Sequence, residues 1–285
     1  MCAESIRLYS HSMKLQSLQE DYPITDAQIE HYRRDGYIKF ENVIPADVLV
    51  ECQKRVAAAV AAEEHTDLLG REMAEGAPKP SDTYSQIFTQ RVNLWQRHET
   101  VKEIVMSSRL ANIAARLCGE SVRIWHDQAL FKDAKTGAKT PWHQDAPYWP
   151  HADKTRQLTI WIAMKDATID NGCLSFLPGT QVLGPREPVQ LADEHPKGVY
   201  DIAPECRGVT AKVVELKAGS CTFHNGLTFH YAGPNRSEAV REAFAIIYMP
   251  ASTIYEGAPH VMTNGRDMKV GEVLNGETFP VVSTV

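Results

Sequence analysis

One short segment of the chain places an imidazole and a carboxylate two residues apart. His143 and Asp145 lie in PWHQDAPYWP, directly after the turn-forming stretch KTGAKT. In an extended strand, residues i and i+2 point to the same face, so these two side chains would converge while Gln144 points away. Such a pair can bind a metal ion. Alone, the pattern is weak evidence, because a surface His–Asp pair is the commoner arrangement.

A second segment supplies further histidines. His224 and His230 lie in FHNGLTFHYAGPN, and the pattern places them on strands that flank an Asn-Gly turn. Either histidine would complete a set of two imidazoles and one carboxylate with the first pair. This set leaves half of an octahedral coordination sphere open and is typical of non-heme Fe(II) oxygenases. The residues themselves do not choose between the two histidines.

Arg241 follows the second segment, in EAVREAFAII. On the same face of this predicted strand it is followed by small or apolar residues, namely Ala243, Ala245 and Ile247. A guanidinium that points inward among such groups needs an anion, and a ligand carboxylate bound by both of its arms would serve. The alternative is an arginine at the sheet edge that pairs with Glu238 or Glu242.

The secondary structure predicted to position these residues changes from helices to strands at about residue 120. Helical periods predict helices over about 25–35, from Pro45 to about 60, and in two shorter stretches before Gly119. From about Val122 the period is two, and the expected strands are 122–132, 158–164, 173–177, 212–216, 221–224, 227–231 and 242–249. Short strands separated by turns predict an antiparallel jelly roll or cupin-like barrel with the helices packed outside.

Alternation within two strands predicts which side chains face a cavity. In VRIWHDQALFK one face would carry a mixture of apolar and polar groups, namely Val122, Ile124, His126, Gln128 and Leu130. In LTIWIAM, Trp161 would line the cavity and the reverse, apolar face would receive the helices. We interpret His126 as a satisfied core histidine. We expect the other histidines to be solvated, namely His11, His31, His65, His98, His151, His195 and His260.

Composition excludes several classes of function. The 285 residues are 43% hydrophobic and carry a net charge of −6, without a dense Lys/Arg cluster, so nucleic acid and anionic membranes are not expected partners. No apolar run is long enough to span a bilayer, and the first residues lack the apolar centre of a secretory signal, so we expect a cytoplasmic protein. The six cysteines form no CxxC pair, which favours reduced core thiols.

The domain organisation follows from the same patterns. We expect one domain over 1–285, with a helical flank at about 20–120, a jelly-roll core at about 121–250 and a C-terminal extension at 251–285. The stretches 66–90 and 181–210 are rich in Gly, Pro and charge, and are too long to be simple turns. They are candidate lids over a site.

Taken together, PWHQD, LTIWIAMKDATIDNGCLSFLPGTQ and FHNGLTFHYAGPN, with Arg241 downstream, resemble the phytanoyl-CoA dioxygenase family of Fe(II)- and 2-oxoglutarate-dependent oxygenases. The resemblance is strongest over about 122–249 and looser over the helices from about 25. It implies a double-stranded β-helix in which iron is bound by His143, Asp145 and His230. His230 is preferred to His224 because it stands at the family's offset from the arginine.

The resemblance also implies the co-substrate contacts. Arg241 would pair with the distal carboxylate of 2-oxoglutarate, with Gln128, Trp161 and, by a looser match, Arg91 nearby. The position two after the distal metal ligand, often a hydroxyl residue in relatives, is Ala232 here. That hydrogen bond would therefore be either missing or supplied by another group such as Thr159 or Thr228. Related halogenases carry a small residue in place of Asp145, so its carboxylate argues against halogenation.

The expected function is thus a dioxygenase that hydroxylates an unactivated C–H bond of a small, partly apolar metabolite. It would consume O2 and 2-oxoglutarate and release succinate and CO2. Two alternatives stay open: a cupin-like metallo-enzyme that does not use 2-oxoglutarate, and a catalytically inactive jelly-roll binding protein. The sequence sets neither the substrate nor the oligomeric state.

Overall fold

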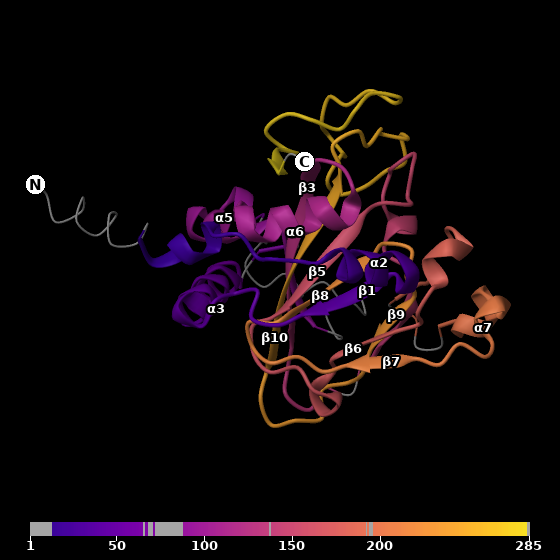
Figure 1. The fold of residues 1–285 in the computed structure, drawn as a ribbon, viewed down its shortest axis with the longest axis horizontal. Helices are drawn as coiled ribbons and strands as arrows, with labels where there is room; N and C mark the ends of the chain where they lie inside the picture. The colour runs from indigo at the N-terminus through magenta and orange to yellow at the C-terminus, as the bar shows by residue number, and fades with distance from the viewer. Residues whose placement is uncertain are drawn as a thin grey trace, which may run out of the picture.

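Two antiparallel sheets pack face to face, and the N-terminal helices cover the outer face of the larger one (Figure 1). The structure is a computed structural model, in which residues 13–64, 66–67, 71, 88–136, 138–191, 193 and 196–283 are described. Its architecture confirms the expected mainly β jelly roll with external helices. Among the described residues, no helix is long and apolar enough to cross a membrane.

The helices begin and end where the local signals predict. Helix α2 (Asp26–Asp35) has a complete capping box: the Thr25 side chain accepts from the Gln28 backbone, and the Gln28 side chain accepts from the Thr25 backbone N–H at 2.8 Å. Gly36 ends it in the left-handed region, at φ 76°. The other helices of the flank are η1 (Met13–Gln19), α3 (Ala46–Ala62), η2 (Leu94–Gln96), α5 (Glu99–Val105) and α6 (Ser108–Cys118).

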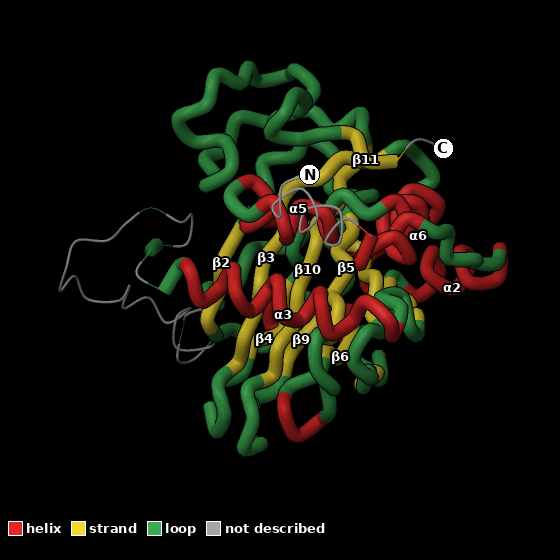
Figure 2. The backbone as a smooth tube through the Cα atoms, turned by 90° about the vertical axis from the view of Figure 1, so that its left-hand side faces the viewer, coloured by secondary structure: helices red, strands yellow, loops and turns green. Residues whose placement is uncertain are grey.

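The larger sheet forms the floor on which the helices lie. Its strand order is β1-β8-β5-β10-β3-β11, and β2 pairs antiparallel with the C-terminal half of β3, at residues 128–131. The strands are β1 (Tyr37–Phe40), β2 (Thr89–Val92), β3 (Val122–Lys132), β5 (Leu158–Ala163), β8 (Cys221–Asn225), β10 (Arg241–Pro250) and β11 (Val281–Ser283). Figure 2 shows α3 crossing the strands of this sheet. The helical flank and the C-terminal extension therefore also contribute strands.

The smaller sheet closes the other side of the barrel. Its order is β4-β9-β6-β7, with β4 (Thr140–His143), β6 (Leu174–Phe176), β7 (Lys212–Val214) and β9 (His230–Ala232). Side chains from both sheets share one apolar cluster, in which Trp161 and Ala245 of the larger sheet meet Phe176 of the smaller one. The remaining short elements are η3 (Ala146–Tyr148), η4 (Ile169–Asn171), η5 (Thr180–Leu183), α7 (Val199–Ile202) and η6 (Pro204–Cys206).

A β-bulge in β3 corrects the expected inner face of that strand. His126 pairs with Ile247, but Ile124 pairs with Tyr248, so Trp125 is an extra residue on β3. The alternation therefore reverses at this point. Val122 and Ile124, expected to face the cavity, pack instead in the core beneath the helices, whereas His126, Gln128 and Leu130 do line the cavity.

Of the two candidate lids, only 181–210 falls largely within the described residues. Most of 66–90 lies outside the described residues. The stretch 181–210 is largely described and is tied to the segment of the first motif. The Gln144 amide donates to the Gly184 carbonyl at 3.1 Å and accepts from the Arg186 backbone N–H at 2.8 Å. Gln144 thus points away from the cavity, as predicted, and Leu191 of the same stretch lines the cavity. Movement of either lid stays a prediction.

Candidate active site

The structure brings together three side chains from the two motifs. His143 ends β4, His230 begins β9, and the two are direct partners across this antiparallel pair, with ring centroids 4.1 Å apart. Asp145 follows β4, and its Oδ1 lies 3.5 Å from Nε2 of each imidazole. One ligand atom from each of the three residues lies within 4.8 Å of the others. The predicted convergence is therefore present.

Main-chain hydrogen bonds fix the orientation of both imidazoles. Nδ1 of His143 lies 2.8 Å from the Pro141 carbonyl, and Nδ1 of His230 lies 3.0 Å from the Thr228 carbonyl. A carbonyl oxygen can only accept, so Nδ1 carries the hydrogen in each ring and Nε2 keeps its lone pair. Both lone pairs are then available on the side of Asp145, as for histidines that bind a metal.

The Asp145 carboxylate is oriented through its other oxygen. Oδ2 accepts from the Thr159 hydroxyl at 3.0 Å and lies 3.3 Å from Nε2 of His224. Oδ1 is thus left for the centre between the two imidazoles. His224, which the sequence could not distinguish from His230, is placed on Oδ2 and outside the three-residue donor set.

The protonation states of Asp145 and His230 fit a divalent cation. Burial alone would raise the pKa of Asp145, but the neighbouring imidazoles, that of His230 first, hold this pKa well below its usual value. Burial, together with the imidazole of His143, lowers the pKa of His230. A carboxylate and neutral imidazoles are the forms that bind metal. Two nitrogens and one oxygen on one side suit a transition metal such as iron, with its remaining positions open to the cavity.

Arg241 lies in the same cavity, which has a volume of about 670 Å³. It is 3% exposed, and its Nε and Nη1 have no hydrogen-bond partner within the described structure. Its guanidinium lies over the Trp161 ring, 5.1 Å from the centroid, and burial lowers its pKa to about 10. The alternative acidic partners are engaged elsewhere, Glu242 with Lys165 and Glu238 with Lys135. A buried cation of this kind requires an anionic ligand.

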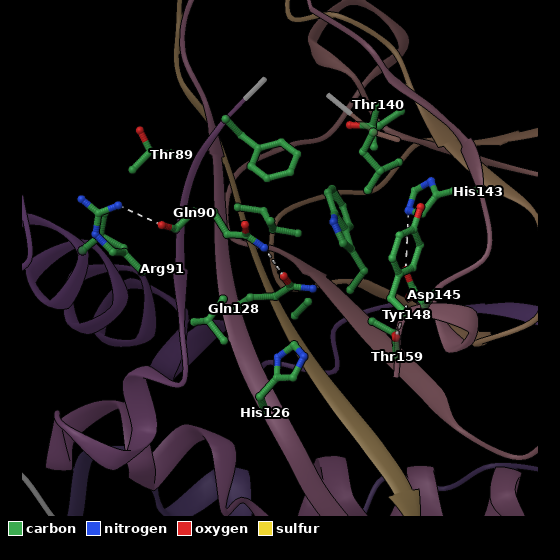
Figure 3. Close-up of a pocket in the computed structure, with 18 of the residues that line it drawn as sticks. Thr89, Gln90, Arg91, His126, Gln128, Thr140, His143, Asp145, Tyr148 and Thr159 are labelled. Carbon is green, nitrogen blue, oxygen red and sulfur yellow. Dashed lines mark hydrogen bonds and ion pairs between the residues drawn. The ribbon is translucent and has the colours of Figure 1, made fainter. Parts of the chain in front are cut away.

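The other expected co-substrate residues divide into two groups. Gln128 and Trp161 line the cavity, and the side-chain oxygen Oε1 of Gln128 accepts from the side-chain amide Nε2 of Gln90 at 2.6 Å. Arg91 is at the cavity wall, but it donates to the main-chain oxygens of Glu63 and Gln90 at 3.0 and 2.8 Å (Figure 3).

The position of Thr228 contradicts the prediction that it contacts the co-substrate. It does not line the cavity, and its buried hydroxyl donates to the Gly36 carbonyl at 2.8 Å. The expected strand 227–231 begins only at His230, because the backbone turns back at Thr228, whose N–H donates to the Asn225 carbonyl at 2.9 Å. Of the two threonines considered, only Thr159 lines the cavity, as Ala232 also does.

Three histidines expected to be solvated make tertiary contacts instead. His260 lines the cavity, His151 is fully buried against the Trp125 ring at 4.5 Å, and His98 contacts the Glu63 carboxylate at 2.8 Å. The expectation rested on the absence of a partner at metal-site spacing. Tertiary contacts that no local pattern shows bury His151 and engage the partly exposed rings of His98 and His260.

Comparisons with known proteins agree with this geometry. The sequence model described as "Phytanoyl-CoA dioxygenase (PhyH)" matches residues 32–243. The chain is 22% identical over 257 residues to the peroxisomal phytanoyl-CoA dioxygenase of Bos taurus, covering 86% of this chain and 74% of that one.

Two solved structures superpose on most of this chain. The non-heme alpha ketoglutarate dependent carbocyclase SnoK superposes with a TM-score of 0.75 at 25% identity, covering 91% of this chain and 97% of SnoK. The epimerase SnoN, in complex with Fe3+, alpha ketoglutarate and nogalamycin RO, has a TM-score of 0.72 at 26% identity, covering 90% and 98%. Because the family match spans most of the chain and includes all three residues of the donor set, this protein belongs to the phytanoyl-CoA dioxygenase family.

Proposed function

We propose that the protein is an Fe(II)- and 2-oxoglutarate-dependent oxygenase that hydroxylates an unactivated C–H bond of a small molecule. One observation carries the proposal: a single cavity contains both a His-Asp-His donor set and a buried guanidinium without a partner in the described structure. The family match and the ligands named for SnoN support the same pair of cofactors.

Different residues of the cavity would bind the iron and the co-substrate. His143 and His230, through Nε2, and Asp145, through Oδ1, would hold the iron. Arg241 would bind the distal carboxylate of 2-oxoglutarate, because its planar fork matches a carboxylate and no acidic side chain among the described residues pairs with it. Thr159 keeps the Asp145 carboxylate in place.

Iron(II) and 2-oxoglutarate, when bound, supply the oxidising chemistry: one atom of O2 enters the substrate as hydroxyl, the other enters succinate, and CO2 leaves. The chain determines which C–H bond reacts, because it positions the substrate. Apolar groups such as Trp149 and Leu191 line the cavity and exclude water from the reacting region. Asp145 occupies the position where a small residue would be needed for chloride, so the proposal is hydroxylation and not halogenation.

The test is anaerobic addition of Fe(II) and 2-oxoglutarate, followed by visible absorption. We expect the charge-transfer band of the metal-bound keto acid in the wild-type protein and its loss in Asp145→Ala. Asp153→Ala is the matched control, because Asp153 lies in the following loop, bonds to Thr155 and does not line the cavity. Failure of the wild type to bind Fe(II) would favour an inactive binding protein. If iron binds but 2-oxoglutarate produces no charge-transfer band, the result would favour a cupin-like metallo-enzyme that does not use 2-oxoglutarate.

A further inference from the structure

Two imidazoles outside the metal-binding set face the same cavity. His126 projects from β3 beside Gln128, on a different wall from His143 (Figure 3), and His260 reaches the cavity from the C-terminal extension. Their ring centroids are 6.4 Å apart, with an interplanar angle of 22°. Both rings lie near Trp125, at 6.1 and 5.1 Å between centroids. Neither imidazole has a role in the proposed binding of iron or 2-oxoglutarate.

The backbone gives these two rings opposite hydrogen-bonding roles. Nδ1 of His126 lies 3.3 Å from the Asp127 carbonyl, which can only accept, so Nδ1 carries the hydrogen and Nε2 is an acceptor. Nδ1 of His260 accepts from the Met262 backbone N–H at 3.1 Å, so its hydrogen is on Nε2, which is a donor. Burial lowers the pKa of His126 to about 3 and that of His260 to about 4, which keeps both rings neutral.

We propose that His126 and His260 form a substrate subsite that binds a hydroxyl group of a neutral, flat substrate, the first as acceptor and the second as donor. A hydroxyl is the group that can donate to one ring and accept from the other. A hydroxyl oxygen that lies about 2.8 Å from a nitrogen of each ring, with the bent geometry of a hydroxyl, can bridge rings whose centroids are 6.4 Å apart. This subsite rests on the proposed function, because it names the substrate class of the same cavity.

The charges of the cavity favour a neutral substrate. Its described cationic side chains are Arg91, which is bonded to main-chain oxygens, and Arg241, which is assigned to the co-substrate. The exposed residues Glu64 and Asp133 add carboxylates to the wall. A substrate with phosphates or a carboxylate would therefore find repulsion and, among the described residues, no unengaged cation. Aromatic rings, including those of Tyr148 and Trp149, offer flat apolar surface.

Three small probes test the subsite in the Fe(II)- and 2-oxoglutarate-loaded protein under anaerobic conditions. They are 2-naphthol, which donates and accepts, 2-methoxynaphthalene, which only accepts, and 2-naphthoate, which is an anion. Isothermal titration calorimetry should give a Kd for 2-naphthol about five- to ten-fold lower than that for the methyl ether, since one hydrogen bond is lost. The naphthoate should bind most weakly.

Variants assign each hydrogen bond to its ring. His126→Leu should weaken 2-naphthol binding about five- to ten-fold and leave the methyl ether unchanged, because the ether has no hydrogen to donate. His260→Leu should weaken both. His151→Leu is the matched control, since His151 packs on the same Trp125 ring but does not line the cavity, and it should change either Kd less than two-fold.

The outcomes separate this subsite from the proposed function. The visible spectrum of the wild type is recorded before any probe is added. Absence of the charge-transfer band at that stage contradicts the proposed function. If the band is present, equal affinity for 2-naphthol and its ether, tighter binding of 2-naphthoate, or no binding of 2-naphthol at millimolar concentration overturns the subsite. The wild-type comparison decides the question even if a histidine variant fails to fold.

Discussion

His143 and His230 are cross-strand partners, and each imidazole is oriented by the carbonyl two residues before it in its own segment. Nδ1 of His143 bonds to Pro141 and Nδ1 of His230 bonds to Thr228, at 2.8 and 3.0 Å. These bonds use the backbone, so the two nitrogen ligands are set by the pairing of β4 with β9. The third ligand, Asp145, is oriented instead by the side chains of Thr159 and His224, so substitutions can test how it is positioned.

Thr159→Val should weaken Fe(II) binding about ten-fold or more, because the variant loses the hydroxyl that bonds Oδ2 of Asp145 at 3.0 Å. The Kd is measured by anaerobic titration of Fe(II) with 2-oxoglutarate present. Thr222→Val is the matched control: Thr222 is fully buried on β8, and its hydroxyl has no hydrogen-bond partner in the described structure. Equal weakening in both variants would assign the effect to packing and contradict the role of Thr159.

Arg241→Met should have opposite effects on co-substrate use and on stability. Loss of the charged, forked donor should raise the KM for 2-oxoglutarate about 10- to 100-fold. The melting temperature of the ligand-free protein should stay the same or rise, because a buried charge without an acidic partner in the described structure is replaced by an apolar side chain. Succinate release and differential scanning fluorimetry measure the two effects.

The control for this variant is Arg236→Met, the same change at an exposed arginine just before β10. It should alter neither quantity measurably. Unchanged 2-oxoglutarate kinetics in Arg241→Met would instead favour an enzyme that does not bind this co-substrate.

The site was predictable because its signals are local in the sequence. Alternation places His143 and Asp145 on one face, and small neighbours on one face of β10 indicate that Arg241 points inward without a partner. What joins these pieces is the pairing of β4 with β9, which short-range patterns do not encode. For that reason the residues left His224 and His230 undistinguished, and only the resemblance to a family separated them.

The errors arise where tertiary structure overrides a local period. The bulge at Trp125 reverses the faces of β3, and it is visible only in the pairing with β10, where His126 lies opposite Ile247 and Ile124 opposite Tyr248. The hydroxyl of Thr228 is used by the Gly36 carbonyl, a contact between residues far apart in the chain. The burial of His151 likewise depends on the C-terminal extension, to which it pairs through a bridge with Tyr255.

Asp127 should make the stability fall as the pH rises from about 4 to about 7. This fully buried carboxyl accepts from the backbone N–H groups of Leu94 and Trp95 at 3.1 and 3.0 Å, yet burial raises its pKa from 3.8 to about 7 against these bonds and the charge of Arg97. In this window the folded state keeps a proton that the unfolded state has lost. The stabilisation is complete below about pH 4 and is lost as the pH rises through 7, up to about 4 kcal/mol.

Asp127→Asn isolates this contribution, because an amide does not titrate. Urea unfolding at pH 4.5, 5.5, 6.5 and 7.5 gives the free energy of unfolding of both proteins. The wild type minus the variant should decrease steadily across this range, whatever the constant cost of the lost hydrogen bond. A difference that is independent of pH, or that increases, contradicts the prediction.

Two helix-ending glycines should differ in their tolerance of alanine. Gly36 and Gly119 both lie in the left-handed region, at φ 76° and 74°, so alanine costs each about 1 kcal/mol of backbone strain. At Gly119 the nearest atom to an added Cβ is the end of Arg33, at 3.7 Å. At Gly36 the Cβ would lie 2.3 Å from both Gln181 Oε1 and Thr228 Oγ1, so both side chains must move.

We therefore expect Gly119→Ala to lower the free energy of unfolding by about 1 kcal/mol and Gly36→Ala by about 3 kcal/mol. Urea denaturation measures both. The second change should also reach the active site, because a displaced Thr228 carries the carbonyl that orients His230. Fe(II) affinity should thus fall in Gly36→Ala and stay unchanged in Gly119→Ala. If iron affinity is the same in both folded variants, the contact between Gly36 and Thr228 serves stability alone and does not position the metal ligand.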